Sequence, residues 1–551
     1  MPYLSLLIIL PLLAALLVVF LPNRNQTTFR WIALVASLLN FLLTLLLFFR
    51  FDKSVAGYQF VEQTDWITLS LGPLGVVSID YFLGLDGISL PLVLLAGLVL
   101  AIGAISSFEI KQKQKAYFAL YSLLSASLMG CFVALDLFLF FLFFEFMLLP
   151  MYFLIGLWGG ERREYASIKF FVYTFLGSIF ILLVMIGLYL SVADPVETAV
   201  AMGLVPGKEL VDANVIADVQ NYLQEGRIEA DQIVHTFSIP YMAEPGNYLP
   251  QSLLNIAADH VLFGQSARML AFVLVFLGFA VKLPVVPLHT WLPDAHVEAP
   301  TPVSVVLAGV LLKIGGYGFI RIAYGLFPDG AIVFAPWLGG LGVLSIVYGA
   351  LNALAMNDLK RMIAYSSVSH MGFVLLGLAS LTSEGVNGAL FQMVSHGILS
   401  AMLFLIAGVL YTRTHDRQLD SYRGLAARMP GYVTLTAIAF FGSLGLPALS
   451  GFIGEFFTIM GAFNSPYLPN WMAPVATLGI VLAAGYFLWT LQRLFFGEFW
   501  SKHEAGLLTD VTPRERLMLV PLAALALMLG ILPGILLNLT QSTVGEFLKN
   551  F

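Results

Sequence analysis

The sequence predicts an all-α polytopic membrane protein with about 14 transmembrane helices, arranged as two inverted five-helix repeats with broken helices 7 and 12. Hydrophobic residues make up 59% of the 551 residues and charged residues only 11%, against about 25% in an ordinary soluble protein. Apolar runs of about 20 residues, long enough to span a bilayer, recur along the chain. Two of these runs are interrupted by prolines, at 283–287 and 446–451, as in the discontinuous helices of transporters.

The apolar runs assign the spans in chain order. They centre near 3–21, 31–50, 84–106, 116–133, 134–158, 168–192, 267–297, 301–324, 331–354, 362–381, 387–411, 432–461, 473–495 and 516–538. Four regions follow: helices 1–3 (1–115), a first half with helices 4–8 (116–325), a second, inverted half with helices 9–13 (326–500), and helix 14 (501–551). The first run lacks a basic segment before it, so we expect a retained helix and not a cleaved signal.

The distribution of positive charge predicts the orientation in the membrane. Most of the 27 lysines and arginines lie in loops after odd-numbered spans, among them Arg24, Lys111, Arg162 and Arg413. Loops rich in lysine and arginine stay in the cytoplasm. An even number of spans therefore places both termini outside.

One long extramembrane segment, 194–262, is acidic and poor in basic residues, as an outside loop can be. Its stretch 212–224 has the pattern of a short amphipathic helix. Two interpretations stay open for this segment. It contacts a neighbouring subunit, or it is an insertion without chemistry.

Glu145 and Lys282 are the first pair of charges expected inside the membrane. A charge at the bilayer centre costs about 2.5–3.5 kcal/mol on insertion scales, so such residues are rare and usually functional. Pro284 and Pro287 follow Lys282 and break its helix. Burial and a nearby carboxylate shift a lysine pKa in opposite directions, so a small movement of Glu145 would load or unload a proton.

Further ionisable side chains lie in later spans. Lys313 comes about twelve residues into its span, roughly 18 Å along a helix and near the bilayer centre. His370, His396 and Glu455 follow in spans ten to twelve. Histidine titrates near neutral pH and suits a proton relay, although each histidine could be a packing residue and Glu455 a hydrogen-bonded structural acid.

A polar group near the end of span seven has two interpretations. His289, Asp294, His296 and Glu298 form either a proton-uptake funnel or a solvated helix end, and the absence of a third clear ligand disfavours a metal.

Three other features have simpler structural interpretations. Asp136 is expected to cap a helix, and the charged stretches 161–164 and 358–361 to anchor the topology, with subunit contact as a second interpretation. The single cysteine, Cys131, excludes an internal disulfide and a cysteine metal cluster.

Several motifs resemble one family closely. They are KLPVVPLHTWLPDAHVEAPTPVSVVLAGVLLKIGGYG (282–318), LFFEFMLLPMYFLIGLWGG (142–160), AYSSVSHMGF (364–373) and SGFIGEF (450–456). Together they resemble the antiporter-like membrane subunits of respiratory complex I, the NADH:quinone oxidoreductase, over about residues 85–500. The resemblance implies fourteen helices, two inverted halves, and a proton path through mid-membrane charges.

The resemblance also implies residue roles and partners. Glu145 and Lys282 would be the coupling pair, Lys313 the central relay and Glu455 the exit-side site, with His370 and His396 as relay or central-axis histidines. NAD, FMN, iron–sulfur clusters and quinone would lie in other subunits, with no cofactor, metal or nucleic acid on this chain. The partners would be other membrane subunits, including neighbouring antiporter-like chains, in a bacterial inner membrane.

Two further function classes compete with this interpretation. A subunit of a cation/proton antiporter or of a membrane-bound hydrogenase would share the same module. An inert membrane scaffold would have to accommodate Glu145, Lys282, Lys313 and Glu455 inside spans at a cost of several kcal/mol each, which disfavours it.

Overall fold

The computed structural model describes all residues except 1, 24–25, 71–75 and 259, so Arg24 of the topology argument lies outside the described part. Eleven described helical segments are each long and apolar enough to cross a membrane, and a pair bent by 65° brings the number to twelve. The helices of these segments are α1 (Tyr3–Phe20), α2 (Gln26–Arg50), α3 (Ser89–Ser106), α4 (Gln114–Val133), α5 (Leu137–Phe146), α6 (Leu148–Trp158), α7 (Arg163–Tyr189), α13 (Thr301–Val306), α14 (Leu312–Gly318), α15 (Pro328–Ala355), α16 (Leu359–Ala379), α17 (Ser383–Thr414), α20 (Met472–Phe495) and the bent pair α21 (Pro513–Ile531) and α22 (Gly534–Phe547). The predicted class, a mostly helical multi-pass membrane protein, is confirmed.

Two pairs of shorter helices lie where the sequence predicts broken spans. α11 (Ala267–Lys282) and α12 (Trp291–Glu298) flank the first break, and α18 (Pro430–Ser443) and α19 (Ser450–Asn464) flank the second. Each of these helices is too short to count as a span by itself. The total of fourteen and the inverted relation of the two halves stay predictions.

The first break is possible in a membrane because the backbone groups that it frees find partners. Non-helical backbone survives at membrane depth only when protein or water satisfies it. The indole Nε1 of Trp291 donates to the carbonyl of Val281 at 2.8 Å, and the amide of Val286 donates to Ser345 Oγ at 3.1 Å. Pro284 and Pro287 have no amide hydrogen to satisfy.

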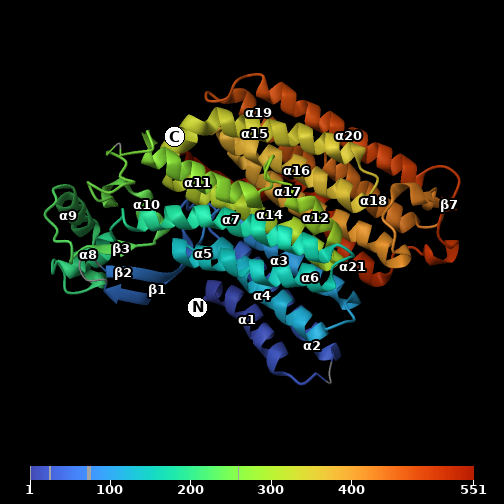
Figure 1. The fold of residues 1–551 in the computed structure, drawn as a ribbon, viewed down its shortest axis with the longest axis horizontal. Coiled ribbons are helices and arrows are strands. Elements are labelled where there is room, and N and C mark those ends of the chain that lie inside the picture. The colour runs from blue at the N-terminus through green and yellow to red at the C-terminus, as the bar shows by residue number, and fades with distance from the viewer. Residues whose placement is uncertain (1, 24–25, 71–75, 259) are drawn as a thin grey trace.

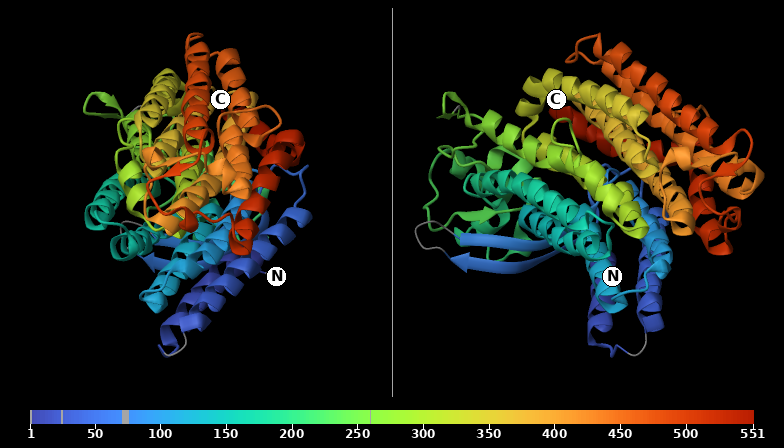
Figure 2. Two further views of the ribbon diagram at one scale, coloured as in Figure 1. Left: turned by 90° about the vertical axis from the view of Figure 1, so that its right-hand side faces the viewer. Right: turned by 45° about the vertical axis from the view of Figure 1, so that its right-hand side comes forward.

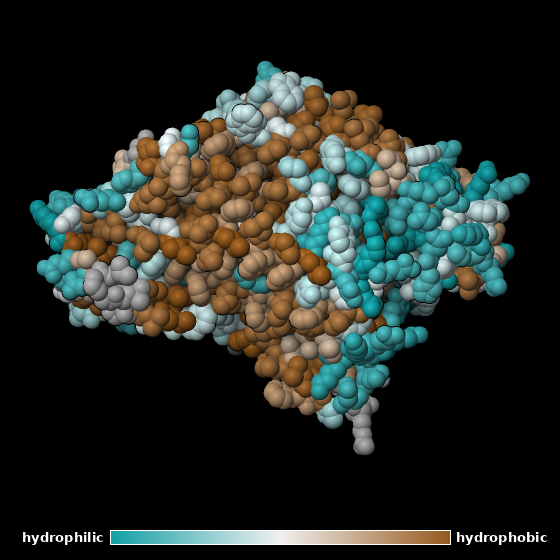
Figure 3. Space-filling view, viewed as in Figure 1, coloured by the Kyte–Doolittle hydropathy of each residue, from teal (hydrophilic) through white to brown (hydrophobic). Residues whose placement is uncertain are grey.

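The helices run side by side along the length of the molecule in Figures 1 and 2. An apolar belt crosses the middle of the face in Figure 3 and separates two hydrophilic ends. One end carries a small β-sheet with α8 (Pro195–Ala201), and the other carries β7 (Trp500–Ser501). Both chain termini lie toward the end with the strands (Figure 1), as an even number of spans requires.

A three-stranded sheet is the main feature that the sequence analysis did not anticipate. β1 (Gln59–Ser70) and β2 (Val76–Leu85) pair antiparallel, and β3 (Val234–Thr236), from the extramembrane segment, pairs parallel with β2. The segment 194–262 is therefore folded onto the hairpin. Its predicted amphipathic helix is confirmed as α9 (Ala213–Gln224), with Asp212 as the cap.

The sheet continues into the start of α5. Asp136 caps this helix, as predicted, by accepting a hydrogen bond from the amide of Leu139 at 2.8 Å. The amide of Leu137 donates to the carbonyl of Phe237 at 2.7 Å, and the amide of Ile239 donates to the carbonyl of Leu135 at 2.8 Å. The N-terminal end of α5 is therefore held by the chain that follows β3.

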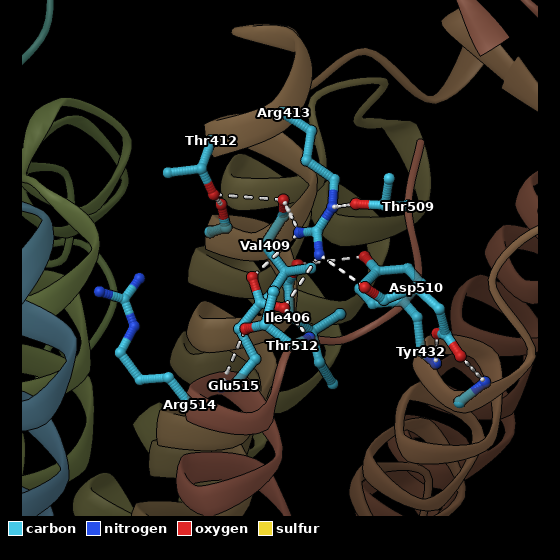
Figure 4. A network of polar contacts seen from close by, with 12 residues as sticks. Ile406, Val409, Thr412, Arg413, Tyr432, Thr509, Asp510, Thr512, Arg514 and Glu515 are labelled. Atoms are coloured by element: carbon cyan, nitrogen blue, oxygen red, sulfur yellow. Dashed lines mark hydrogen bonds and ion pairs between the residues drawn. The ribbon is translucent and has the colours of Figure 1, made fainter. Parts of the chain in front are cut away.

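A polar network fixes the C-terminal span at the opposite end (Figure 4). The guanidinium of Arg413, at the end of α17, donates to both carboxylate oxygens of Glu515 in α21, at 3.0 and 2.9 Å. Asp510 accepts hydrogen bonds from the amides of Gly431 and Tyr432, which begin α18. These contacts join α17, α18 and α21 around the start of the second broken span.

Candidate functional site

Lys313 lies in a segment whose membrane-spanning window is entirely buried. Its ammonium nitrogen Nζ lies 2.5 Å from the carbonyl oxygen of Ala308 and 2.8 Å from Nδ1 of His396 on α17. π-helical turns at Leu307–Leu311 and Phe319–Tyr324 flank α14, and such turns are frequent at functional sites. When the lysine ammonium donates to Nδ1, His396 holds its proton on the other ring nitrogen, so one contact links two proton carriers.

The chain of contacts continues from His396 to Glu455. The rings of His396 and His370 have centroids 5.5 Å apart. Nδ1 of His370 lies 3.2 Å from Oε1 of Glu455, whose side chain is 1% exposed. Gln392 places its Nε2 3.2 Å from the same Nδ1, so a neutral amide, absent from the sequence interpretation, competes for the histidine.

A small cavity separates the two histidines. It has a volume of about 10 Å³ and is lined by both His370 and His396 together with Ser395 and Ser443. Within the described part of the chain, Nε2 of His370 and Oγ of Ser443 have no hydrogen-bond partner. A cavity of this size and polarity accommodates about one water molecule.

Gly445 makes room for the carboxyl group of Glu455. This glycine has φ = +78°, a conformation that other residues rarely adopt. A Cβ at this position would collide with Oε2 of Glu455. The second break therefore shapes the site through its backbone as well as ending a helix.

Glu145 and Lys282 lie near each other but do not form the predicted ion pair in this structure, where no carboxylate of a described residue is within 4.0 Å of Lys282 Nζ. The lysine instead donates to the carbonyl of Phe144 at 3.2 Å, and its Nζ lies 3.6 Å from the centroid of that ring. Glu145 is half-buried, between the exposed side chains of Leu142 and Phe146. Its Oε1 has no hydrogen-bond partner in the described part of the chain.

Three of the four polar residues near the end of span seven are buried, which disfavours a solvated helix end. His289 and His296 are 3% and 0% exposed, and Glu298 is 8% exposed. His296 stacks on Phe404 with centroids 4.4 Å apart, and neither of its ring nitrogens has a hydrogen-bond partner among the described residues.

Asp294 is the charged member of this group that is paired. It accepts from Lys169 at 2.8 Å and from Arg361 at 3.2 Å. Arg162, from the charged stretch 161–164, lies 4.0 Å from the same carboxylate, so this stretch meets Arg361 of the stretch 358–361 at Asp294. The role of the two stretches as topology anchors stays a prediction.

Lys360, in the stretch 358–361 that the sequence predicts to anchor the topology, is buried. Its side chain is 2% exposed and donates to the carbonyl of Ala299 at 3.0 Å. Asp358 caps α16 and pairs with Arg417 at 3.1 Å. A cavity of about 570 Å³, lined by Glu298, Asp358 and Arg417, opens at this end of the helices.

Comparisons with known proteins place this chain in one family. The model for the NADH:quinone oxidoreductase/Mrp antiporter transmembrane family matches residues 134–202 and 236–482. NADH-quinone oxidoreductase subunit M of Rhodobacter capsulatus is 39% identical, over 100% of this chain and 96% of that protein. NAD(P)H-quinone oxidoreductase chain 4 2 of Thermosynechococcus vestitus is 38% identical, over 97% of this chain and 89% of its own length.

Two solved structures contain chains with the same fold. A chain of respiratory complex I from Thermus thermophilus with bound NADH matches with a TM-score of 0.78 and 29% identity, over 100% of this chain and 99% of its own. A chain of the Mrp complex from Dietzia sp. DQ12-45-1b has a TM-score of 0.74 at 22% identity, over 99% and 97% of the two chains. The second likeness concerns the fold alone.

Proposed function

Because this chain belongs to the NADH:quinone oxidoreductase/Mrp antiporter membrane family, we propose that it conducts protons through the buried chain Lys313–His396–His370–Glu455. It is a proton-translocating, antiporter-like membrane subunit of NADH-quinone oxidoreductase, or complex I, of the M type that corresponds to mitochondrial chain 4. It therefore works together with other subunits of that complex. The route of the protons and the role of each residue are the proposal.

One observation carries the proposed route. Four titratable side chains from α14, α17, α16 and α19 lie in sequence, each near the next, and each is buried. Groups that donate and accept in turn pass a proton by small rotations, and a water in the cavity between the histidines would complete the one gap.

We assign proton uptake to the end of the molecule that holds the large cavity. Glu298 and Asp358 line that cavity, and Lys360 lies buried beside it. His296 lies within electrostatic range of both Lys360 and Lys313 and has free ring nitrogens in the described structure. These positions favour the uptake funnel over the other interpretation of this group.

Glu145 and Lys282 form the coupling pair in this proposal. In the present state Lys282 contacts a backbone carbonyl and an aromatic ring, so its counter-charge is withdrawn. Movement of α5 would bring the two side chains together and change how readily the lysine holds its proton. Quinone reduction elsewhere in the complex would drive that movement.

Redox groups are assigned to other subunits. The single cysteine, Cys131, is buried, so this chain cannot supply the cysteine ligands of an iron–sulfur cluster. NAD, FMN and quinone are assigned to other subunits on the same proposal. A subunit of a cation/proton antiporter or of a membrane-bound hydrogenase is the second candidate, and identities of 36–39% to complex I chains over the full length of this chain favour the first.

The central relay can be tested at Lys313. Arginine retains the positive charge but does not release a proton, because its pKa stays above about 12. We expect Lys313→Arg and Lys313→Ala to assemble into the complex and to lose most proton pumping in membrane vesicles. Pumping at the parental rate by Lys313→Arg, with loss in Lys313→Ala, would show that only the charge matters and would refute the relay.

The proposed location is the bacterial inner membrane with both termini outside. Asp218 and His415 are exposed at opposite ends of the molecule, and the native Cys131 is buried. We expect Asp218→Cys to react with an impermeant maleimide added outside intact cells, and His415→Cys to react only after the membrane is opened. Reaction of both variants from one side would contradict the orientation.

A further inference from the structure

A pocket of about 520 Å³ lies at the end of α20, outside the charged path. Its polar lining includes Arg423, Arg493 and Asp420, and its aromatic lining includes Trp489, Phe496 and Trp500. It lies at the end of the molecule that carries β7, where Figure 3 shows the apolar belt giving way to hydrophilic side chains. Tryptophan is enriched at this depth, at the boundary between acyl chains and headgroups.

The charges of this pocket do not cancel. Arg493 pairs with Asp420, donates to Asn357 Oδ1 at 3.0 Å, and has its guanidinium carbon 4.9 Å from the centroid of the Trp489 ring. Arg423 has no carboxylate within 4.0 Å among the residues that the structure describes. The pocket therefore has one positive charge without a partner.

The backbone holds Arg423 in the pocket. Gly497 has φ = +90°, and a Cβ there would lie 2.8 Å from Nε and 3.1 Å from a terminal nitrogen of Arg423. The strand β6 (Tyr422–Arg423) pairs with β7, which fixes the backbone of the arginine. The guanidinium thus occupies space that only a glycine leaves open.

An apolar stripe leads from the membrane belt to this pocket. Leu478, Val481 and Leu488 are exposed along α20, and Trp489 and Phe496 continue the stripe into the pocket. An amphiphile with an acyl chain and an anionic head matches both parts. A free anion would use only the arginines.

We propose that this pocket binds the phosphate headgroup of an anionic phospholipid, with the acyl chains along α20. Arg423 supplies the unpaired cation, Arg493 a second one shared with Asp420, and the tryptophans the amphipathic rim. Basic pockets of this kind recognise the charge of a lipid head as well as its position at the interface.

The test uses the intact purified complex with photoactivatable phosphatidylglycerol, and phosphatidylcholine with the same diazirine-bearing chains. We expect phosphatidylglycerol to cross-link preferentially within residues 478–500. Arg423→Gln should lower this cross-linking about fivefold, the equivalent of about 1 kcal/mol for one basic residue near a lipid surface. Gly497→Ala should lower it too, although every charge is kept, because the arginine is displaced.

Arg428→Gln is the matched control, since Arg428 lies at the same end against Phe499 and does not line the pocket. It should leave the cross-linking unchanged. Equal labelling by both lipids, or equal loss in Arg428→Gln and Arg423→Gln, would overturn the proposal. Suppression by millimolar inorganic phosphate would assign the pocket to a free anion, and loss of a neighbouring subunit in Arg423→Gln without loss of lipid would assign it to a protein contact.

Discussion

The two broken helices carry opposite charges and hold them differently. Lys282 is the last residue of α11, before its break, and lies more than 4.0 Å from any carboxylate in the described structure. Glu455 follows the second break, in α19, and lies 3.2 Å from the imidazole of His370. The first half holds its charge apart from its counter-charge, whereas the second half holds an acid and a base in contact.

The carboxylates of the two halves, Glu145 and Glu455, also differ in exposure. Glu145 is half-buried on a surface of apolar side chains, whereas Glu455 is sealed within the chain. The first site is therefore open to influence from a neighbouring subunit. The second site responds only to rearrangement inside the chain. This comparison suggests that coupling enters through the first half and that the second half completes the transfer.

The largest loss of proton pumping is expected from substitutions of Glu145 and Lys282 in the first half. Glu145→Gln and Lys282→Ala should each lower proton pumping and coupled quinone reduction at least about tenfold, the low end of what a positioned acid or base contributes. Both variants should still assemble, since neither residue forms an ion pair in this structure. Proton uptake by inverted vesicles and native gels measure the two properties, with Glu164→Gln, in the first turn of α7, as the control. Normal pumping in either variant would refute the coupling pair.

Proton pumping should be somewhat less sensitive to substitution of Glu455 in the second half. Glu455→Gln preserves the shape of the side chain but removes the acid that contacts His370, so pumping should fall severalfold while quinone reduction falls less. Glu455→Asp should recover part of the loss. The matched control is Glu384→Gln, in the first turn of α17. A glutamine variant that pumps like the parent would show that the contact with His370 is structural.

A smaller effect should follow from Gly445→Ala. Alanine at positive φ costs about 1–2 kcal/mol, and the new Cβ would displace the carboxyl of Glu455. Gly203→Ala is a matched control, because Gly203 has φ = +72° and no atom within 4 Å of its added Cβ. We expect lower pumping only in Gly445→Ala, at similar complex content. Equal activity of the two variants would show that the carboxyl position is not critical.

The smallest effect is expected on the pH dependence of the stability of α8 and the three-stranded sheet, which lie away from both breaks. Burial raises the pKa of Asp194 to about 7, and the carboxylates of Glu197 and Asp80 add to the increase. The folded state then binds more protons than the unfolded state between about pH 4 and pH 7, so stability falls as pH rises through this window.

Hydrogen exchange of the amides in α8 and β3, corrected for intrinsic rates, should show protection that falls from pH 5 to pH 7. Asp194→Asn keeps the helix cap and should abolish the dependence. Asp212→Asn, which changes the exposed cap of α9, should not alter it. Protection that rises with pH in the parent would contradict the assignment.

The parts of the fold that depend on local composition could be predicted from the sequence. Long apolar runs predicted the helices, and the prolines near Lys282 predicted the first break. The hairpin β1–β2 was missed because its first strand lacks a regular alternation of polar and apolar residues, with four polar residues in a row at 62–65. Its partner strand β3 comes more than a hundred residues later, and no local pattern indicates that pairing.

The candidate site was predictable only in its charged members. Lys313 and Glu455 stand out because charges are rare in apolar runs. Gln392 is neutral, and its contact with His370 depends on how α16 and α17 pack. Lys360 resembles its basic neighbours in sequence, and its burial follows from contacts with Ala299 and the end of α12. The separation of Glu145 and Lys282 depends on how their helices pack, which neither segment alone indicates.

The way in which α5 begins has a consequence for biogenesis. Leu137, the first residue of α5, and Leu135, just before it, are hydrogen-bonded to Phe237 and Ile239, which the ribosome adds about a hundred residues later. If the acidic segment lies outside, as proposed, these hydrogen bonds at the start of α5 can form only after that segment has been exported. We expect a nascent chain stopped before residue 237 to carry Glu145 on a helix that is inserted but not yet anchored. Maturation of the first half would then be ordered by translocation and not by translation alone.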